Sequence, residues 1–169
     1  MKLRRIYSRP KRRHTSVLFV SSSADSDSNL LPLHLNGALN AFSALTGTGP
    51  IGQFFYYQGR LTALDPEGSL FNYLTTFGSE YLGPSGGCST YGSLGFFPGA
   101  GSNKCARYGT GFYLHSNEEN SQLGATLVYN WVGGFYACGS AKEVVYKVHE
   151  SDGRDDCVPI ELNTVPVIN

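Results

Sequence analysis

The stretch from Gln122 to His149 places the strongest constraint on how this chain can fold. Apolar residues alternate with small or polar ones from Leu123 to Trp131, and a period of two indicates a strand with one face on a core. Gly133-Gly134 follows, and two glycines between apolar runs predict a tight turn, because type I′ and II′ turns require positive φ. Two further apolar runs flank Gly139-Ser140. We therefore expect a β-meander at the centre of an all-β core.

Similar short apolar segments recur along the rest of the chain. About ten strand candidates, spaced by roughly 8–12 residues, predict a sandwich or closed barrel of antiparallel strands. A two-residue turn at Gln58-Gly59 should join the runs 53–57 and 60–64 into a hairpin. Frequent glycine and proline divide the region 88–108 into short pieces. Pro159 and Pro166 place the last strand at a sheet edge, since proline cannot donate to a ladder.

The chain has four cysteines at wide spacing. There is no C-x-x-C motif, and an even number of cysteines then fits two disulfides better than a metal site. Three pairings are possible, and we favour Cys88–Cys105 and Cys138–Cys157 because each closes a loop rich in glycine and polar residues. Disulfides of this kind indicate an extracellular compartment. The alternative is a cytosolic protein with four reduced cysteines.

Charge is distributed unevenly between the N-terminus and the rest of the chain. Seven of the 13 basic residues lie in the first 13 positions, and the other 156 residues hold 6 basic and 13 acidic side chains, a balance of −7. An acidic body repels nucleic acid and anionic membranes, so we expect no nucleic-acid partner. No apolar run approaches the roughly 18 residues that span a bilayer, so we expect no membrane span.

We divide the chain into residues 1–29, a basic and then Ser/Asp-rich disordered tail, and residues 30–169, a single β domain. A secretory signal needs an apolar core of about 7–15 residues. The run Val17–Val20 is too short, so no signal peptide is recognisable. The basic patch ending at Arg13 is open to three interpretations: a solvated tail, a nuclear-localisation signal, or a misassigned start that replaces a signal peptide.

The last third of the chain carries a resemblance. Phe135-Tyr-Ala-Cys138 matches an aromatic–x–Ala–Cys strand, Tyr146-Lys-Val148 a Tyr-x-Val strand, and Cys157–Leu162 a Cys-x-Pro-Ile/Val-x-Leu strand. In these motifs the chain resembles small secreted fungal proteins of the phialide-associated cell-wall and IgE-binding type. The turn at Tyr57–Leu61 is similar to that family's aromatic-x-Gly-x-Leu turn. The resemblance implies a β-rich extracellular domain at or near the cell wall, without established catalytic residues.

The sequence contains no convincing catalytic or metal motif, and we expect no cofactor. Gly83–Gly87 matches G-x-S-x-G but lacks the preceding strand and following helix of a nucleophile elbow. His115 with Glu118 and Glu119 has neither calcium-loop nor zinc-site spacing. We interpret His34 as structural. Two carboxylates from distant loops can meet to hydrolyse glycosides, but nothing in the sequence selects a pair.

Glycan binding is the activity with identifiable candidate residues. Sugar sites combine aromatic rings with amides or carboxylates that bind the hydroxyls. The candidates are Trp131, Asn130, Tyr56, Tyr57 and Tyr91. The alternation that begins at Leu123 instead predicts a buried Trp131 that anchors the core, with Asn130 on the opposite, exposed face.

Three hypotheses follow, in order of preference. The first is a non-catalytic, secreted fungal cell-wall or surface-associated protein with a structural or interaction role, whose partner is a cell-wall polysaccharide or another surface protein. The second is a glycan-binding module that uses exposed aromatic side chains. The third is a hydrolase with an unassigned carboxylate pair. Solvent exposure of Trp131 beside Asn130 would move the second hypothesis ahead of the first.

Overall fold

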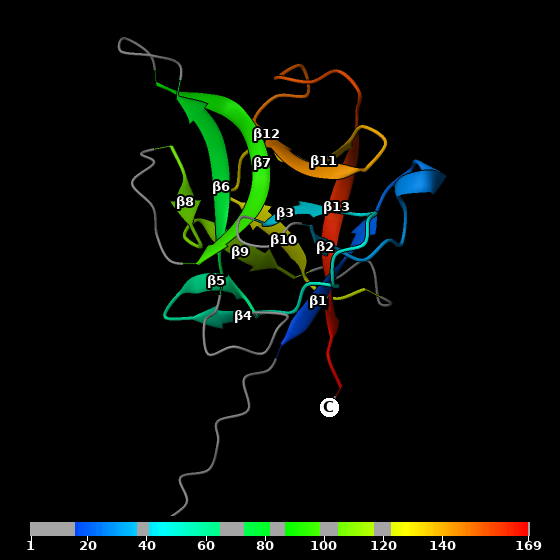
Figure 1. Cartoon of the computed structure of the whole chain (residues 1–169), viewed down its shortest axis with the longest axis vertical. Coiled ribbons are helices and arrows are strands. Elements are labelled where there is room, and N and C mark those ends of the chain that lie inside the picture. Colours follow the sequence, from blue (N-terminus) through cyan, green and yellow to red (C-terminus); the bar gives the residue numbers. More distant parts are fainter. Residues whose placement is uncertain are drawn as a thin grey trace, which may run out of the picture.

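The computed structural model describes residues 16–36, 41–64, 73–81, 87–98, 105–116 and 123–168. Within these ranges the strands join one curled antiparallel sheet (Figure 1), which confirms the predicted all-β class. No helix in the described ranges is long and apolar enough to cross a membrane. The elements are β1 (Val17–Ser22), the 3-10 helix η1 (Ser26–Ser28), β2 (His34–Asn36), β3 (Ala41–Ala44), β4 (Phe54–Tyr57), β5 (Arg60–Ala63), β6 (Tyr73–Tyr81), β7 (Cys88–Pro98), β8 (Arg107–Tyr108), β9 (Phe112–His115), β10 (Thr126–Tyr129), β11 (Gly134–Cys138), β12 (Glu143–Lys147) and β13 (Cys157–Pro166).

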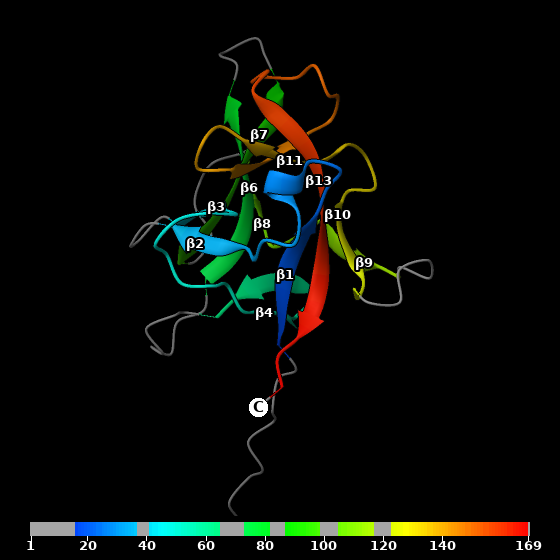
Figure 2. The same ribbon diagram turned by 90° about the vertical axis from the view of Figure 1, so that its right-hand side faces the viewer.

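The sheet follows the order β1-β4-β5-β6-β7-β3-β12-β11-β13-β10-β9, with β2 beside β3 and β8 beside β6. Strand β13 also pairs with β1 along six residues, from Val17↔Pro166 to Ser22↔Glu161. The two strands lie side by side in Figure 2. Strand β7 additionally pairs with β12.

The prediction that the last strand lies at an edge is wrong, because β13 pairs with β1, β10 and β11. Its prolines are compatible with this position. The carbonyl oxygen of Pro159 accepts a hydrogen bond from Ser23 Oγ at 2.9 Å, just beyond the end of β1. In a strand the N–H and C=O of one residue point to the same side. The missing N–H of Pro159 therefore faces a side where the β1 ladder has already ended, and Pro166 is the last residue of the strand.

The predicted domain start near Leu30 is also wrong. Phe19 on β1 is completely buried in the core, so the apolar run 17–20 belongs to the domain. The serine-rich segment after it is ordered by its own hydroxyls, since buried Ser21 donates from Oγ to the carbonyl oxygen of Ser28 at 2.7 Å. Residues 1–15 of the predicted tail lie outside the described residues.

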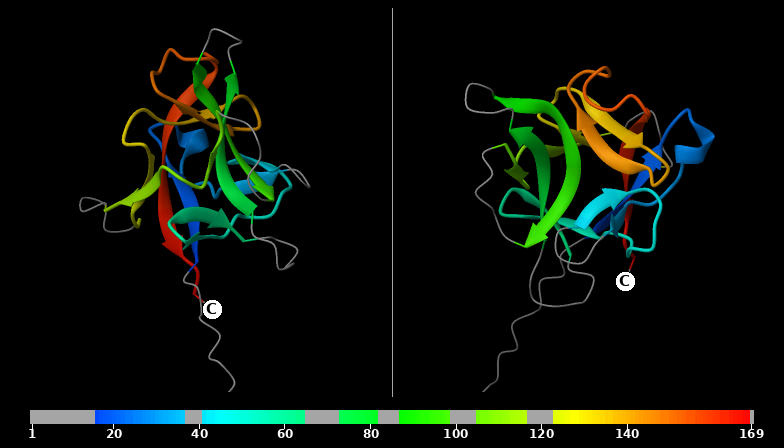
Figure 3. Two further views of the ribbon diagram at one scale, coloured as in Figure 1. Left: turned by 90° about the vertical axis from the view of Figure 1, so that its left-hand side faces the viewer. Right: turned by 45° about the horizontal axis from the view of Figure 1, so that its top comes forward.

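The core fills the inside of the curled sheet, which Figure 3 shows from two further sides. Three phenylalanine rings join distant strands there. Phe54 lies 4.8 Å from Phe19 and 5.4 Å from Phe96, measured between ring centroids. Leu33, on the approach to β2, is completely buried in the same cluster. The core therefore draws on β1, β4 and β7, from three parts of the sequence.

Two predicted hairpins are present, and one predicted pairing is not. Strands β4 and β5 form a hairpin around Gln58 and Gly59, which both have positive φ, as a type I′ turn requires. Strands β11 and β12 also pair, with Phe135 opposite Tyr146. Strands β10 and β11 do not pair with each other; each of them pairs with β13 instead. The expected meander is therefore correct only in its second half.

Strand β7 runs unbroken for 11 residues where short pieces were expected. Its buried Gly92 and Gly95 lie opposite residues of β6, β12 and β3. Glycine in a strand interior allows close approach of neighbouring backbones, so these glycines mark packing within the sheet rather than turns.

Both predicted disulfides are confirmed. Cys88 bonds Cys105, and Cys138 bonds Cys157. The second disulfide links residues that are directly opposite each other on β11 and β13. Two disulfides are compatible with an extracellular protein.

Candidate functional site

The candidate site begins at the turn that follows β10. Asn130 and Trp131 both have positive φ, 49° and 60°, and the N–H of Val132 donates to the carbonyl oxygen of Tyr129 at 3.3 Å. This is a type I′ turn. The strand alternation ends at Tyr129, so Trp131 does not continue the buried face. Its side chain is 61% exposed, and the prediction that it anchors the core is wrong.

The backbone conformation of Trp131 is costly for a residue of its size. Asparagine tolerates the left-handed region, because its side chain bonds locally. A bulky residue pays about 1–2 kcal/mol there, and glycine is the usual second residue of such a turn. The backbone conformation at this position is thus unfavourable for tryptophan, and its side chain stays largely exposed, which points to a functional role for its ring.

Three contacts fix the turn in place. The N–H of Asn130 donates to the carbonyl oxygen of Gly111 at 2.8 Å. The hydroxyl of Tyr146 donates to the carbonyl oxygen of Val132. Gly133, with φ of 69°, lies so close to Lys147 that an added Cβ would stand 2.1 Å from the Lys147 carbonyl oxygen. The indole is therefore carried by a backbone that is already ordered without a ligand.

Trp131 lies on aromatic side chains of β9. Its ring stacks on Tyr113 with centroids 5.5 Å apart and planes 22° apart, and His115 meets it edge-on at 5.7 Å. Tyr113 is 46% exposed. Because the buried Phe112 points into the core, Tyr113 and His115 project from the outer face of β9. We call Trp131, Tyr113 and His115 the aromatic platform.

The three predicted tyrosines lie at different places. The hydroxyl of Tyr56 donates to the carbonyl oxygen of Phe112 at 2.9 Å, which brings it beside β9. Burial, and to a smaller extent the neighbouring Tyr113, raises the pKa of Tyr56 to about 12. Tyr57 is exposed and points to the other side of β4 from Tyr56. Tyr91 packs over Gly153, in the loop before β13.

A groove of about 310 Å³ opens next to the turn. It lies where β10 and β11 separate over β13. Buried rings of Tyr129, Phe135 and Tyr146 line it, and Trp131 and Glu161 contribute to its wall. Its volume is at the lower end of the range of about 300–1,000 Å³ for small-molecule sites.

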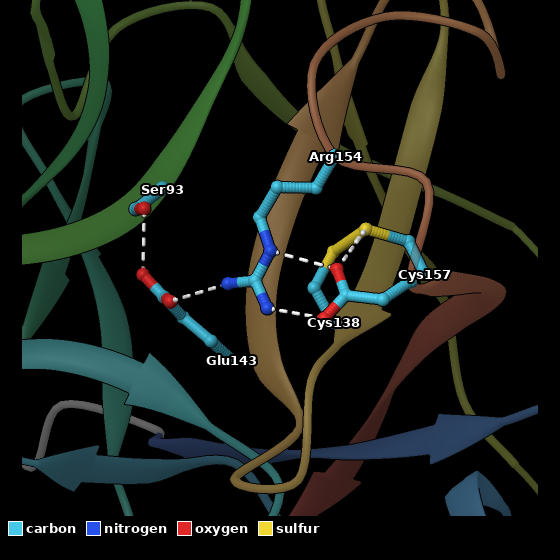
Figure 4. Close-up of polar contacts among 6 residues, drawn as sticks. Ser93, Cys138, Glu143, Arg154 and Cys157 are labelled. Carbon is cyan, nitrogen blue, oxygen red and sulfur yellow. Dashed lines mark hydrogen bonds and ion pairs between the residues drawn. A yellow bond between two sulfur atoms is a disulfide. The ribbon is translucent and has the colours of Figure 1, made fainter.

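A cluster of charged side chains lies at the other end of β11, and it has a structural role. Arg154 bridges Glu143 at 3.4 Å and Asp156 at 2.6 Å, and Ser93 Oγ donates to Glu143 at 2.7 Å. Figure 4 shows this cluster beside the disulfide of Cys138. The Arg154 guanidinium holds the pKa of Asp156 below its usual value, chiefly through its hydrogen bond. Both carboxylates are thus occupied by one cation.

The remaining chemical candidates contribute no site in the described ranges. No group of three or more His, Cys, Asp or Glu residues suited to a metal occurs there. His34 is structural, with Nδ1 2.7 Å from the carbonyl oxygen of Gly49. Gly83–Gly86, Glu118 and Glu119 lie outside the described residues.

Sequence reasoning missed Tyr113 and Glu161, and it considered His115 only as a metal ligand. The run Gly111–His115 is one of the strand candidates in the sequence, and assigning Phe112 to the core would have placed Tyr113 and His115 outside. Glu161 was missed because β13 was expected at an edge, and its position beside β10 and β11 was not foreseen. Asn130 and Trp131 were named correctly as neighbours, but the turn begins three residues before the predicted Gly133-Gly134.

Comparisons with known proteins find no relative. No family model matches the chain. No curated protein and no solved structure matches it either.

Proposed function

We propose that this protein is a non-catalytic, extracellular carbohydrate-binding domain, and that the aromatic platform is its binding surface. The observation that carries the proposal is the exposed indole of Trp131, 61% accessible although it stacks on Tyr113. Since Tyr113 supports one side of the indole, the accessible area must lie largely on its other face and edge. That free face is available to a flat ligand.

The chemistry of the platform suits a pyranose ring. The faces of aromatic rings carry partial negative charge, and the C–H groups on a sugar face carry partial positive charge. A sugar that stacks on the free face of Trp131 has hydroxyls that can reach the adjoining side chains of Asn130 and His115, which donate and accept hydrogen bonds. Because the turn is held by backbone contacts before binding, little conformational entropy is lost when the ligand docks.

The cellular setting is a further proposal. The motifs at Phe135–Cys138 and Cys157–Leu162 resemble those of fungal cell-wall proteins, and the two disulfides suit secretion. We therefore place the protein at a fungal cell surface, where wall polysaccharide is the natural ligand. A purely structural role, or a contact with another surface protein, remains the alternative.

We also propose that the curled sheet is a closed barrel. Ladders lead from β1 through β4, β5, β6 and β7 to β12, and from there through β11 and β13 back to β1. Closure leaves none of these eight strands with a free edge. A sandwich would instead divide them into two sheets.

A polysaccharide pull-down with the oxidised protein tests the function. Insoluble fungal wall glucan, chitin and cellulose should each be assayed with wild type, Trp131→Ala and Tyr57→Ala. Tyr57 is a matched control, because it is an exposed tyrosine that no described contact links to the platform. We expect at least one polymer to retain wild type and the Tyr57 variant, and to lose Trp131→Ala by tenfold or more.

Two results would decide against the proposal. If no polymer retains the wild-type protein, the structural or protein-contact role takes its place. If a polymer retains Trp131→Ala as well as wild type, the platform is not the binding surface. Release of soluble sugar from any polymer would instead favour the hydrolase hypothesis.

A further inference from the structure

Among the described residues, the groove beside the platform contains a single charged side chain, that of Glu161. No described lysine, arginine or histidine lines it. Glu161 is exposed, and in the described part of the chain it forms none of the ion pairs. Its carboxylate is therefore available to a ligand that enters the groove.

The rest of the lining is aromatic and apolar. Tyr129, Phe135 and Tyr146 are each less than 10% exposed and line the groove behind Glu161, and Trp131 lines it at the turn. The face of an aromatic ring attracts a cation within about 6 Å of its centroid. A carboxylate combined with several rings is a suitable environment for an organic cation, and unsuitable for an anion.

The net charge of the chain after Arg13 also favours a cationic ligand. Residues 14–169 carry 6 basic and 13 acidic side chains. Such an excess of negative charge raises the local concentration of cations and speeds their association. A neutral sugar gains nothing from this field, whereas a protonated amino sugar does.

We propose that the ligand is a polysaccharide with free amino groups, such as one built from glucosamine units, whose ammonium group binds Glu161 while a sugar ring stacks on Trp131. This inference rests on the proposed carbohydrate-binding function and narrows its ligand. The site thus combines two elements: the platform, which accepts any suitable pyranose face, and the groove, which selects for positive charge.

Calorimetric titration with three soluble hexamers tests the selection. The ligands are the β-1,4-linked hexamers of glucosamine, N-acetylglucosamine and glucose, which differ at the C2 substituent. The proteins are wild type, Glu161→Gln, Glu150→Gln and Trp131→Ala. Glu150→Gln removes the same charge from an exposed loop position outside the groove, so it reports the effect of net charge alone.

We expect the glucosamine hexamer to bind wild type about fivefold more tightly than the other two at mildly acidic pH, the size of effect of a partly exposed ion pair. Glu161→Gln should abolish this preference, and Glu150→Gln should preserve it. The preference should shrink at high salt and at alkaline pH, where the amine is neutral. Trp131→Ala should weaken all three ligands.

The other outcomes separate the two proposals. Equal affinity for the three hexamers, with loss of binding in Trp131→Ala, would overturn the amino-sugar inference and leave the carbohydrate-binding function intact. A preference that Glu161→Gln and Glu150→Gln reduce equally would assign it to net charge and overturn the role of Glu161. Absence of binding by every hexamer and every wall polymer would overturn both.

Discussion

Two outer faces of the same sheet differ in how far they are covered. The outer face of β11 and β12 carries Tyr136, Val145 and Lys147. Val145 and Lys147 are less than 5% exposed, and the loop 148–156 lies against Lys147. The outer face of β9 and β10 carries the aromatic platform and has no such cover among the described residues. We call them the covered face and the open face.

The covered face is held by polar cross-links. The Lys147 ammonium donates to the carbonyl oxygens of Glu150 and Arg154 and lies 5.0 Å from the Tyr136 ring. Arg154 and the Cys138–Cys157 disulfide hold the far end. The open face lacks a covalent link in the described ranges and depends on stacked rings and one ordered turn. The domain is therefore stabilised by cross-links on one face and presents an exposed aromatic surface on the other.

The largest expected effect comes from removing the covalent link of the covered face. The double variant Cys138→Ala, Cys157→Ala should lower the free energy of unfolding by about 3 kcal/mol, because the disulfide restrains the unfolded chain over a separation of 19 residues. Urea denaturation measures this change. Below the transition the variant should bind glycan as wild type does. Loss of binding in the folded variant would show that the two faces are coupled.

The next effect concerns the buried lysine. Lys147→Met keeps the length of the side chain but removes the donor for two carbonyl oxygens, and a buried group left unpaired costs about 1–3 kcal/mol. We expect a loss of about 2 kcal/mol and faster amide hydrogen exchange in the loop 148–156. Lys142→Met is the control, since its pair with Asp25 spans 3.7 Å at the surface and should contribute less than about 1 kcal/mol. Equal losses in both variants would refute a special role for Lys147.

A smaller effect of opposite sign is expected on the open face. Trp131→Gly gives the turn the residue that its left-handed backbone prefers, so the free energy of unfolding should rise by up to about 1 kcal/mol. Glycan binding should be lost at the same time. Trp131→Ala should lose binding without the gain, because alanine keeps the unfavourable φ. A stability decrease in Trp131→Gly would mean that the indole contributes to folding.

The smallest effect is a pH dependence at Tyr56. Its pKa of about 12 in the folded state exceeds the ordinary 10.0, so folding favours the neutral phenol. This stabilisation is complete below pH 10 and is lost as pH rises towards 12. Burial also raises the pKa of Tyr136 and of Tyr146, so tyrosinate absorbance should show several late-titrating groups, one of which disappears in Tyr56→Phe. The same variant should lose about 1 kcal/mol at neutral pH, with its hydrogen bond to Phe112, and Tyr57→Phe should not.

Local chemistry was readable from the sequence. The hairpin at Gln58-Gly59 follows from turn residues that accept positive φ. The pairing of Cys138 with Cys157 was favoured because the segment between them is rich in glycine and polar residues. The strand candidate 111–115 follows from its run of aromatic and apolar residues. Each of these depends on residues that are close together in the sequence.

Non-local pairing was not readable. Nothing near Cys157–Pro166 reveals that Val17–Ser22 occupies its other side, so the prolines were taken as marks of an edge. The position of Trp131 was mispredicted for a related reason. Alternation extends through Trp131 in the sequence, yet the chain turns at Asn130. The hydrogen bond to Gly111, just before β9, and the bond from Tyr146 on β12 fix the turn there.

The pairing of the first described strand with the last has a kinetic consequence. Val17 meets Pro166, so at a synthesis rate of about 5–20 residues per second β1 waits on the order of ten seconds for its partner. During that interval its backbone groups form an unpaired edge that a second nascent chain can satisfy. Contacts this distant in sequence also slow folding itself. Exchange of β1 between neighbouring molecules is therefore the misfolding route that this topology favours.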